Sequence, residues 1–237
     1  MRIIFEFTEN TSLVPINNQS YMNYYIQKCL GDNNKYHDSK NDYSISSLYG
    51  GKLTDDELHL SFKNGGIIVV TSKNEEFLNT LICGVMSNKE LKWGMKFDKI
   101  NFISEIFRNG WNHFATLSPF IIKKYIDKKN YTFSTLNDSD FVDTVKKHII
   151  KKLSKIYNGI NLTDFDVKII NHPSHKVKKI MVKNVKNEAN QCQVSIFCSS
   201  DVAEKIYNLG IGQSTGSGFG TIYKTENRDK YNLELKK

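Results

Sequence analysis

Residues 210–220 read Gly-Ile-Gly-Gln-Ser-Thr-Gly-Ser-Gly-Phe-Gly and lie between an amphipathic run and a short β-type run. Five of these eleven residues are glycine, out of 14 glycines in the 237-residue chain. Because glycine has no Cβ, such a segment can adopt positive φ angles and let another group approach its backbone closely. Its consecutive N–H groups can bind anionic oxygens, and further polar contacts can come from the side chains of Gln213, Ser214, Thr215 and Ser217. We therefore expect this segment, the glycine-rich loop, to bind phosphate groups; a surface turn without a ligand is the alternative interpretation.

Two nucleotide-binding motifs do not fit the residues around the loop. A Walker loop ends in Gly-Lys-Ser/Thr, and no lysine lies between Gly210 and Thr221. Residues 216–224 superficially match the glycine loop of protein kinases, but the match is one residue short and only 13 residues follow Lys224. A kinase catalytic loop would not fit in that remainder, so we expect neither motif.

The loop has a symmetrical pattern, because Gly-Ile-Gly at 210–212 is followed by five residues and then by Gly-Phe-Gly at 218–220. This pattern resembles the C-terminal glycine-rich loop of the RAMP superfamily. Within that superfamily the chain is most similar to the CRISPR-associated endoribonucleases of the Cas-six family, which cut precursor CRISPR RNA at each repeat. Weaker matches are an opening strand, Val14-Pro15 before a tyrosine-rich helix, a histidine after that helix, and Leu117-Ser118-Pro119. The loop residues that we expect to bind RNA are Gly210, Gly212, Ser214, Thr215, Gly216, Ser217, Gly218, Phe219 and Gly220.

Composition favours a globular protein with a polyanionic partner. Hydrophobic residues make up 39% of the chain, the net charge is +8, and the pI is near 9.1. Only Arg2, Arg108 and Arg228 are arginine, so 30 of the 33 cationic residues are lysine, and an AT-rich genome would explain part of that excess. No apolar run approaches the roughly 20 residues that span a bilayer, and we expect a cytoplasmic protein without a membrane contact. The four cysteines are scattered, so we expect neither a metal nor a cofactor.

The first half of the chain predicts one ferredoxin-like domain. Residues 2–7 are typical of a strand, and Pro15 precedes a helix over 18–30 that stops at Gly31. Further strands are expected at 43–49, 57–62 and 66–71, a helix at 74–85, and extended structure at 91–107. This is the βαββαβ order of a ferredoxin-like domain.

The second half predicts the same order again, although no repeat is visible residue by residue. Strands are expected at 113–117, 120–125, 166–170, 177–185, 193–198 and 221–224, with helices at 140–157 and 200–209. We therefore predict an α+β fold of two tandem ferredoxin-like RAMP domains. Domain 1–112 would carry a catalytic loop, domain 113–237 would carry the glycine-rich loop, and the charged tail from Thr225 would be frayed.

Two groups of lysines are candidate phosphate contacts. Lys147, Lys151 and Lys155 lie four residues apart on one face of the long helix, and several more lysines crowd the strand at 177–185. From these groups we predict that Lys147, Lys151 and Lys178 bind RNA. A merely solvated helix face and a lysine-guarded edge strand are the alternative interpretations.

RNA can be cleaved without a metal because its own 2′-hydroxyl can attack the neighbouring phosphorus. The enzyme must take a proton from that hydroxyl, give one to the departing 5′-oxygen and stabilise charge on the phosphate. Histidine suits the proton transfers, tyrosine can assist, and lysine suits the charge. His37, in the polar segment 31–42, is our candidate for proton transfer.

The resemblance implies a histidine, a tyrosine and a lysine as the catalytic group. His37 matches the family's histidine in position. The family's tyrosine position falls on Gln27, so Tyr25 or another helix tyrosine would substitute, and Lys40 or Lys52 would stand in for the lysine. Tyr21, Tyr24 and Tyr25 share one helix face; we expect at least two of them in the core, and a stacking surface beside RNA is the alternative.

We expect the other histidines to be structural or exposed to solvent. His172 and His175 lie on a turn between strands without a third metal ligand nearby. His59 and His113 lie in predicted strands. His148 lies in the basic helix, where it is also a candidate phosphate contact.

These observations favour a metal-independent endoribonuclease that cleaves CRISPR repeat RNA in precursor crRNA. As the resemblance implies, the products would carry a 5′-hydroxyl and a 2′,3′-cyclic phosphate. A non-catalytic RNA-binding RAMP subunit of a CRISPR effector complex is the first alternative, and a protein that binds ATP at the glycine-rich loop is the second. The expected partner is CRISPR repeat RNA, with other CRISPR effector subunits as candidates, and the protein would be a monomer or a homodimer.

Overall fold

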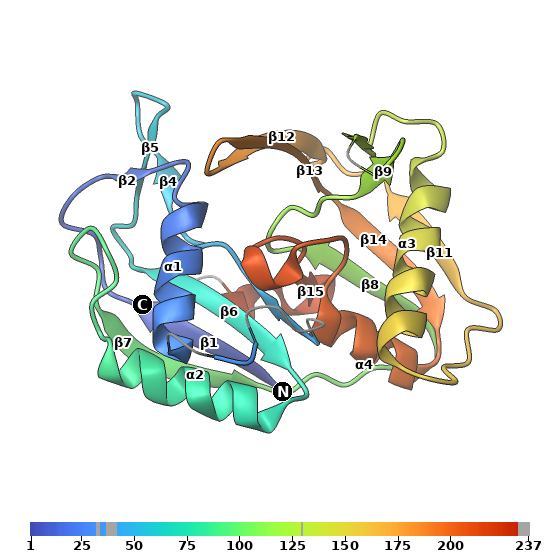
Figure 1. The fold of residues 1–237 in the computed structure, drawn as a ribbon, viewed down its shortest axis with the longest axis horizontal. Coiled ribbons are helices and arrows are strands. Elements are labelled where there is room, and N and C mark those ends of the chain that lie inside the picture. The colour runs from blue at the N-terminus through green and yellow to red at the C-terminus, as the bar shows by residue number, and fades with distance from the viewer. Residues whose placement is uncertain (32–33, 37–41, 129, 232–237) are drawn as a thin grey trace.

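Two four-stranded antiparallel sheets organise the chain in a computed structural model that describes residues 1–31, 34–36, 42–128 and 130–231 (Figure 1). The first sheet contains β1 (Arg2–Phe7), β3 (Tyr43–Ile45), β6 (Gly66–Ser72) and β7 (Phe97–Ile103) in the order β3-β6-β1-β7. Helices α1 (Gln19–Leu30) and α2 (Glu75–Ser87) connect these strands. The predicted βαββαβ order of a ferredoxin-like unit is therefore confirmed in the first half.

Both faces of β1 are covered, which explains why all six of its residues are buried. Ile3 and Phe5 pack beneath the two helices, against Met22 of α1 and Phe77 of α2 among others. Ile4, which alternates with them, points to the opposite face of the sheet. A strand buried on both faces reads as a continuous apolar run, as residues 3–5 do.

The second sheet repeats this arrangement. Its strands are β8 (Gly110–Thr116), β11 (Asp166–Ile170), β14 (Gln193–Cys198) and β15 (Ile222–Lys224), in the order β11-β14-β8-β15. Helices α3 (Phe141–Ile156) and α4 (Ser200–Leu209) supply the apolar side chains that cover it, such as Val145 and Ile206. The expected division between residues 112 and 113 stays a proposal. That boundary would fall within β8, which begins at Gly110.

The two halves meet across the face of the first sheet that α1 and α2 do not cover. Ile4, Ile67 and Val69 from that sheet pack against Leu117 and Tyr231 from the second half. Tyr231 ends the short helix η2 (Thr225–Tyr231) and is only 2% exposed. The predicted fraying from Thr225 is therefore wrong as far as Tyr231, because that ring fills the junction between the halves.

Three small sheets complete the fold, and the sequence predicted them poorly. They are β2-β5-β4 (Val14–Pro15, His59–Ser61, Lys52–Leu53), β9-β10 (Lys123–Tyr125, Tyr131–Phe133) and β12-β13 (Lys176–Val182, Val185–Gln191). The single strand expected at 177–185 is instead a hairpin that turns at Lys183. Among the described residues, none of the helices has the length and apolar character needed to cross a bilayer.

Candidate nucleic-acid interface

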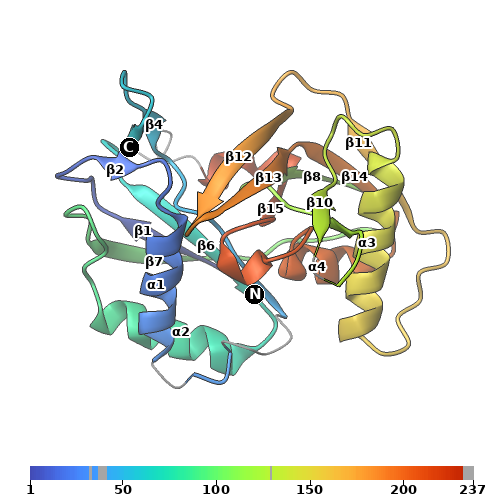
Figure 2. The ribbon, with the colours of Figure 1, turned by 45° about the horizontal axis from the view of Figure 1, so that its top comes forward.

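The glycine-rich loop lies between α1 and α3, where the two halves of the molecule face each other (Figures 1 and 2). Its short helix η1 (Thr215–Ser217) follows α4. Gly218 bridges to Ser46 next to β3 of the first half, and Gln213 bridges to Ile121 of the second half. The loop therefore contacts both ferredoxin-like units.

The glycines at the two ends of the loop are required by close packing of its backbone. Gly210 and Gly220 both have a φ of 68°, and a Cβ on Gly220 would lie 1.8 Å from the carbonyl oxygen of Ile211. The N–H of Ile211 donates to the carbonyl of Gly220 at 2.9 Å, which closes the loop. No residue other than glycine fits this crossing without displacing the backbone.

Six of the nine loop residues expected to bind RNA are buried, and burial leaves little of their surface for a ligand. The buried members are Gly210, Gly212, Thr215, Gly218, Phe219 and Gly220. These residues shape the loop. Ser214 is exposed and Gly216 and Ser217 are half-buried, so the accessible surface is the tip of the loop.

Lys152 of α3 holds the glycine-rich loop in place through hydrogen bonds, a role that we did not predict from the sequence. Its Nζ donates to the carbonyls of Leu209, Gly210 and Gly212 at 2.9–3.2 Å and lies 3.2 Å from Oγ1 of Thr215. Burial lowers the pKa of Lys152 to about 7. The sequence did contain a signal for this role. Lys152 falls at the spacing of the apolar stripe that also contains residues 145, 149 and 156, and a lysine on a buried helix face needs a hydrogen-bond partner.

The N-terminal turn of α1 ties the loop to the basic hairpin β12-β13. The side chain of Gln19 packs against Gly218, where a Cβ would lie 1.8 Å from its Nε2. The backbone N–H of Lys183, at the turn of the hairpin, donates to Oγ of Ser20 at 3.0 Å. The glycine-rich loop, the start of α1 and the turn of the hairpin therefore lie next to one another (Figure 2).

The lysines predicted to bind phosphate occupy two different settings. Lys147 and Lys151 are exposed on α3. Lys178 is half-buried on β12, where burial lowers its pKa and the charge of Lys176 adds to that effect. All three stand as candidate RNA contacts, and those on α3 are the more accessible.

The helix tyrosines differ in their surroundings. Tyr25 is 5% exposed, its hydroxyl donates to the carbonyl of Asn88 at 2.9 Å, and its ring lies against Phe7. Burial raises the pKa of Tyr25 well above its usual range, so the structure argues against a catalytic role for it. Tyr24 is 71% exposed and Tyr21 is 43% exposed, with Nζ of Lys92 3.7 Å from its ring centroid, so the expectation of at least two core tyrosines is wrong.

His37 and Lys40 lie outside the described residues. The chain on either side is described: Tyr36 packs on Phe77, and the carbonyl of Tyr43 accepts a hydrogen bond from Oγ1 of Thr215 in the glycine-rich loop at 3.3 Å. The third candidate, Lys52, lies on β4, in a hairpin that stands apart from the loop in both views (Figures 1 and 2).

Among the other histidines, His59 and His113 make local side-chain contacts, whereas His148 differs. Nδ1 of His59 lies 2.6 Å from Asp56, and Nδ1 of His113 lies 2.7 Å from Oγ of Ser195. His148 is largely buried, its Nδ1 has no hydrogen-bond partner, and burial lowers its pKa to about 4. A neutral, buried imidazole is a poor phosphate ligand, which corrects the suggestion that His148 contacts RNA.

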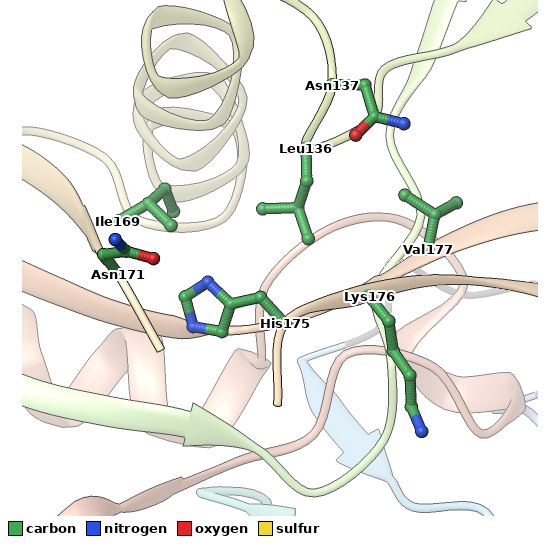
Figure 3. Close-up of a pocket in the computed structure, with 7 residues that line it drawn as sticks. All are labelled: Leu136, Asn137, Ile169, Asn171, His175, Lys176 and Val177. Atoms are coloured by element: carbon green, nitrogen blue, oxygen red, sulfur yellow. The ribbon is translucent and has the colours of Figure 1, made fainter. Parts of the chain in front are cut away.

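His175 lines a pocket of about 330 Å³ at the start of β12 (Figure 3). Its Nε2 accepts a hydrogen bond from the N–H of Gln193 at 3.0 Å, and its ring lies beside Asn171 while Lys176 points away. The other lining residues are Leu136, Asn137, Ile169 and Val177. Within the described part of the chain, no three His, Cys, Asp or Glu side chains are placed to hold a metal ion.

Two ferredoxin-like units with a glycine-rich loop packed between them define a protein of the RAMP superfamily. The family model described as CRISPR associated protein Cas6, C-terminal, matches residues 103–223, which is just over half of the chain. The chain therefore belongs to the Cas6 family. No curated protein sequence matches it.

Solved structures agree on the fold. A protein from Pyrococcus furiosus, described as the product of a Cas6-related gene, has a TM-score of 0.82 at 19% identity, covering 95% of this chain and 98% of that one. A RAMP protein described as binding different RNA substrates has a TM-score of 0.81 at 20% identity, covering 94% and 99%. A Cas6 product complex has a TM-score of 0.67 at 9% identity, covering 93% and 98%.

Proposed function

We propose that this protein is a metal-independent endoribonuclease that cleaves CRISPR repeat RNA in precursor crRNA. The observation that carries the proposal is the position of the glycine-rich loop in this Cas6-family chain. Oγ1 of Thr215 in the loop donates a hydrogen bond to the carbonyl of Tyr43, six residues after His37 in the sequence. A polyanion held on the loop tip would lie against the first half of the molecule. Among the similar structures, one is described as binding RNA and another as a product complex, which supports RNA as the ligand.

The proposed reaction uses the RNA's own nucleophile. A base removes the proton of a 2′-hydroxyl, its oxygen bonds to the adjacent phosphorus, and the bond from phosphorus to the 5′-oxygen breaks. An acid supplies the proton that the 5′-oxygen needs, which leaves a 2′,3′-cyclic phosphate and a 5′-hydroxyl. His37 would perform proton transfer, and Lys40 or Lys52 would stabilise charge on the phosphate.

The helix tyrosine that could assist is Tyr24. It lies one helical turn before Gln27, which occupies the position of the family's tyrosine, and it lies one turn after Ser20, which contacts the basic hairpin. Its exposure leaves the ring accessible to a ligand. RNA backbone would be held by the loop tip at Ser214, Gly216 and Ser217, with Lys147, Lys151 and Lys178 as basic contacts.

A non-catalytic RNA-binding RAMP subunit is the second candidate function. It is favoured by Gln27 at the tyrosine position and by the burial of Tyr25. The two functions separate in one experiment, because His37→Ala should lower the cleavage rate by at least ~100-fold while RNA affinity stays within about twofold. Gel analysis of cleavage and filter binding with labelled repeat RNA measure the two quantities. A wild-type protein that binds the RNA and never cuts it would support the second function.

A further inference from the structure

The hairpin β9-β10 presents a row of aromatic side chains on one face. Tyr131 pairs with Tyr125 across the hairpin, and Phe133 pairs with Lys123. Side chains two residues apart on a strand, and those directly opposite, lie on the same side of a sheet. One face of the hairpin, the aromatic face, therefore carries Lys123, Tyr125, Tyr131 and Phe133.

The rings of the aromatic face contact one another in sequence. The ring centroids of Tyr125 and Tyr131 are 5.9 Å apart, and those of Tyr131 and Phe133 are 5.5 Å apart. Nζ of Lys123 lies 3.9 Å from the centroid of Tyr131, a cation–π distance. Tyr125 at the outer end is 63% exposed. A ring with that exposure gains little from the fold and leaves a flat surface open to a ligand.

The aromatic face is fixed in position next to the glycine-rich loop. Oε1 of Gln213 accepts the N–H of Lys123 at 3.0 Å, and the N–H of Gln213 donates to the carbonyl of Ile121 at 2.8 Å. At the inner end, Phe133 packs against a buried cluster that includes Phe219 of the loop. The same hydrogen bonds that position Gln213, directly before the exposed tip, therefore position the start of the hairpin.

We propose that the aromatic face is a stacking site for unpaired bases of an RNA strand whose backbone lies on the tip of the glycine-rich loop. The inference rests on the proposed RNA function and adds a site to it. Single-stranded nucleic acids bind where aromatic rings offer stacking surfaces beside groups that hold the phosphates. Lys123 supplies positive charge on the same face, while Lys124 on the opposite face is paired with Asp138 and Asp140.

The test compares variants for binding to one labelled CRISPR repeat RNA, offered as a single strand and as a complete duplex. Tyr125→Ala should weaken binding of the single strand on the order of 10-fold, because stacking on that ring is lost. Tyr125→Phe should bind as the wild type does, and the duplex affinity should not change. Phe102→Ala is the matched control, because Phe102 is an exposed aromatic residue on β7 of the other sheet and should have no effect.

A second measurement needs no substitution: 4-thiouridine in the same RNA should crosslink to Tyr125 or Tyr131 on irradiation. Unchanged single-strand binding by Tyr125→Ala, or an equal loss for the duplex, would overturn the stacking site alone and leave the proposed RNA function standing. Crosslinks that avoid both tyrosines would do the same. A wild type that binds neither RNA would overturn the proposed function and the stacking site together.

Discussion

Gly220 shows at the scale of one residue why the loop is so rich in glycine. Its φ of 68° alone would cost an alanine about 1–2 kcal/mol, because a Cβ crowds the following carbonyl in that region. Its additional feature is the approach of the Ile211 carbonyl, 1.8 Å from where a Cβ would stand. The loop therefore tolerates no side chain at this position.

Gly159 allows the two effects to be separated. It has the same φ of 68°, but a Cβ there would meet nothing within 4 Å. We predict that Gly220→Ala lowers the free energy of unfolding by roughly 1–3 kcal/mol more than Gly159→Ala does. Urea unfolding of both variants measures the difference. Equal losses would mean that backbone conformation, not close packing, fixes the glycine at 220.

His148 makes stability depend on pH. Its pKa is about 4 in the folded protein, lowered by burial and then by the charges of Lys152 and Lys151, against about 6.5 in the unfolded chain. Between these values the unfolded chain binds a proton that the folded protein does not, so stability falls as pH drops. Lowering the pH from 7.5 to 5.0 should therefore reduce the free energy of unfolding by about 2 kcal/mol through His148.

The variant His148→Leu removes that titrating group and serves as the comparison. Its free energy of unfolding should fall less than that of the wild type over the same pH range, by the amount assigned to the histidine. Chemical unfolding of the wild type and the variant at pH 7.5 and pH 5.0 gives the four free energies of unfolding that the comparison needs. Parallel losses in both proteins would show that His148 is protonated in the folded state.

At the scale of elements, α3 holds the glycine-rich loop through Lys152. Replacing it with methionine keeps the aliphatic length but leaves the carbonyls of Leu209, Gly210 and Gly212 without this donor. We predict that Lys152→Met lowers the free energy of unfolding by about 1–3 kcal/mol and loosens the loop, which hydrogen exchange at residues 210–220 would detect. Lys151→Met, on the exposed side of the same turn, should change stability by about 0.5 kcal/mol or less. Similar effects of the two substitutions would contradict the anchoring role.

The elements also show which parts of the fold the sequence could predict. The two four-stranded sheets and the helices α1, α2, α3 and α4 follow from strong apolar periodicity, as at Val145 and Ile149 of α3. Strand β13 was missed because its sequence, VKNEANQ, has low β propensity, and the strand depends on seven pairs with β12. The choice among the helix tyrosines depends on Phe7 of β1 and on Asn88, which directly follows α2.

At the scale of the whole molecule, Arg2 shows how the two halves are joined. Its guanidinium is buried on β1, where Nε donates to Thr71 and Nη1 donates to the hydroxyl of Tyr231 at 2.9 Å. Its Cζ lies 3.6 Å from the ring centroid of Tyr207 in α4. The sequence gives no sign of this junction, since Arg2 reads only as part of a strand. Together with the contacts of the glycine-rich loop, the junction fixes the surface on which RNA would lie.

The proposed chemistry on that surface is tested most directly by one RNA and its modified copy. Labelled repeat RNA is incubated with the wild-type protein in excess EDTA, the cut site is mapped, and the 2′-hydroxyl at that nucleotide is then replaced by hydrogen. Our account predicts cleavage of the unmodified RNA to a 2′,3′-cyclic phosphate and a 5′-hydroxyl, with the deoxy copy bound equally well and left intact. Cleavage of the deoxy copy, or binding of the unmodified RNA without cleavage, would contradict it.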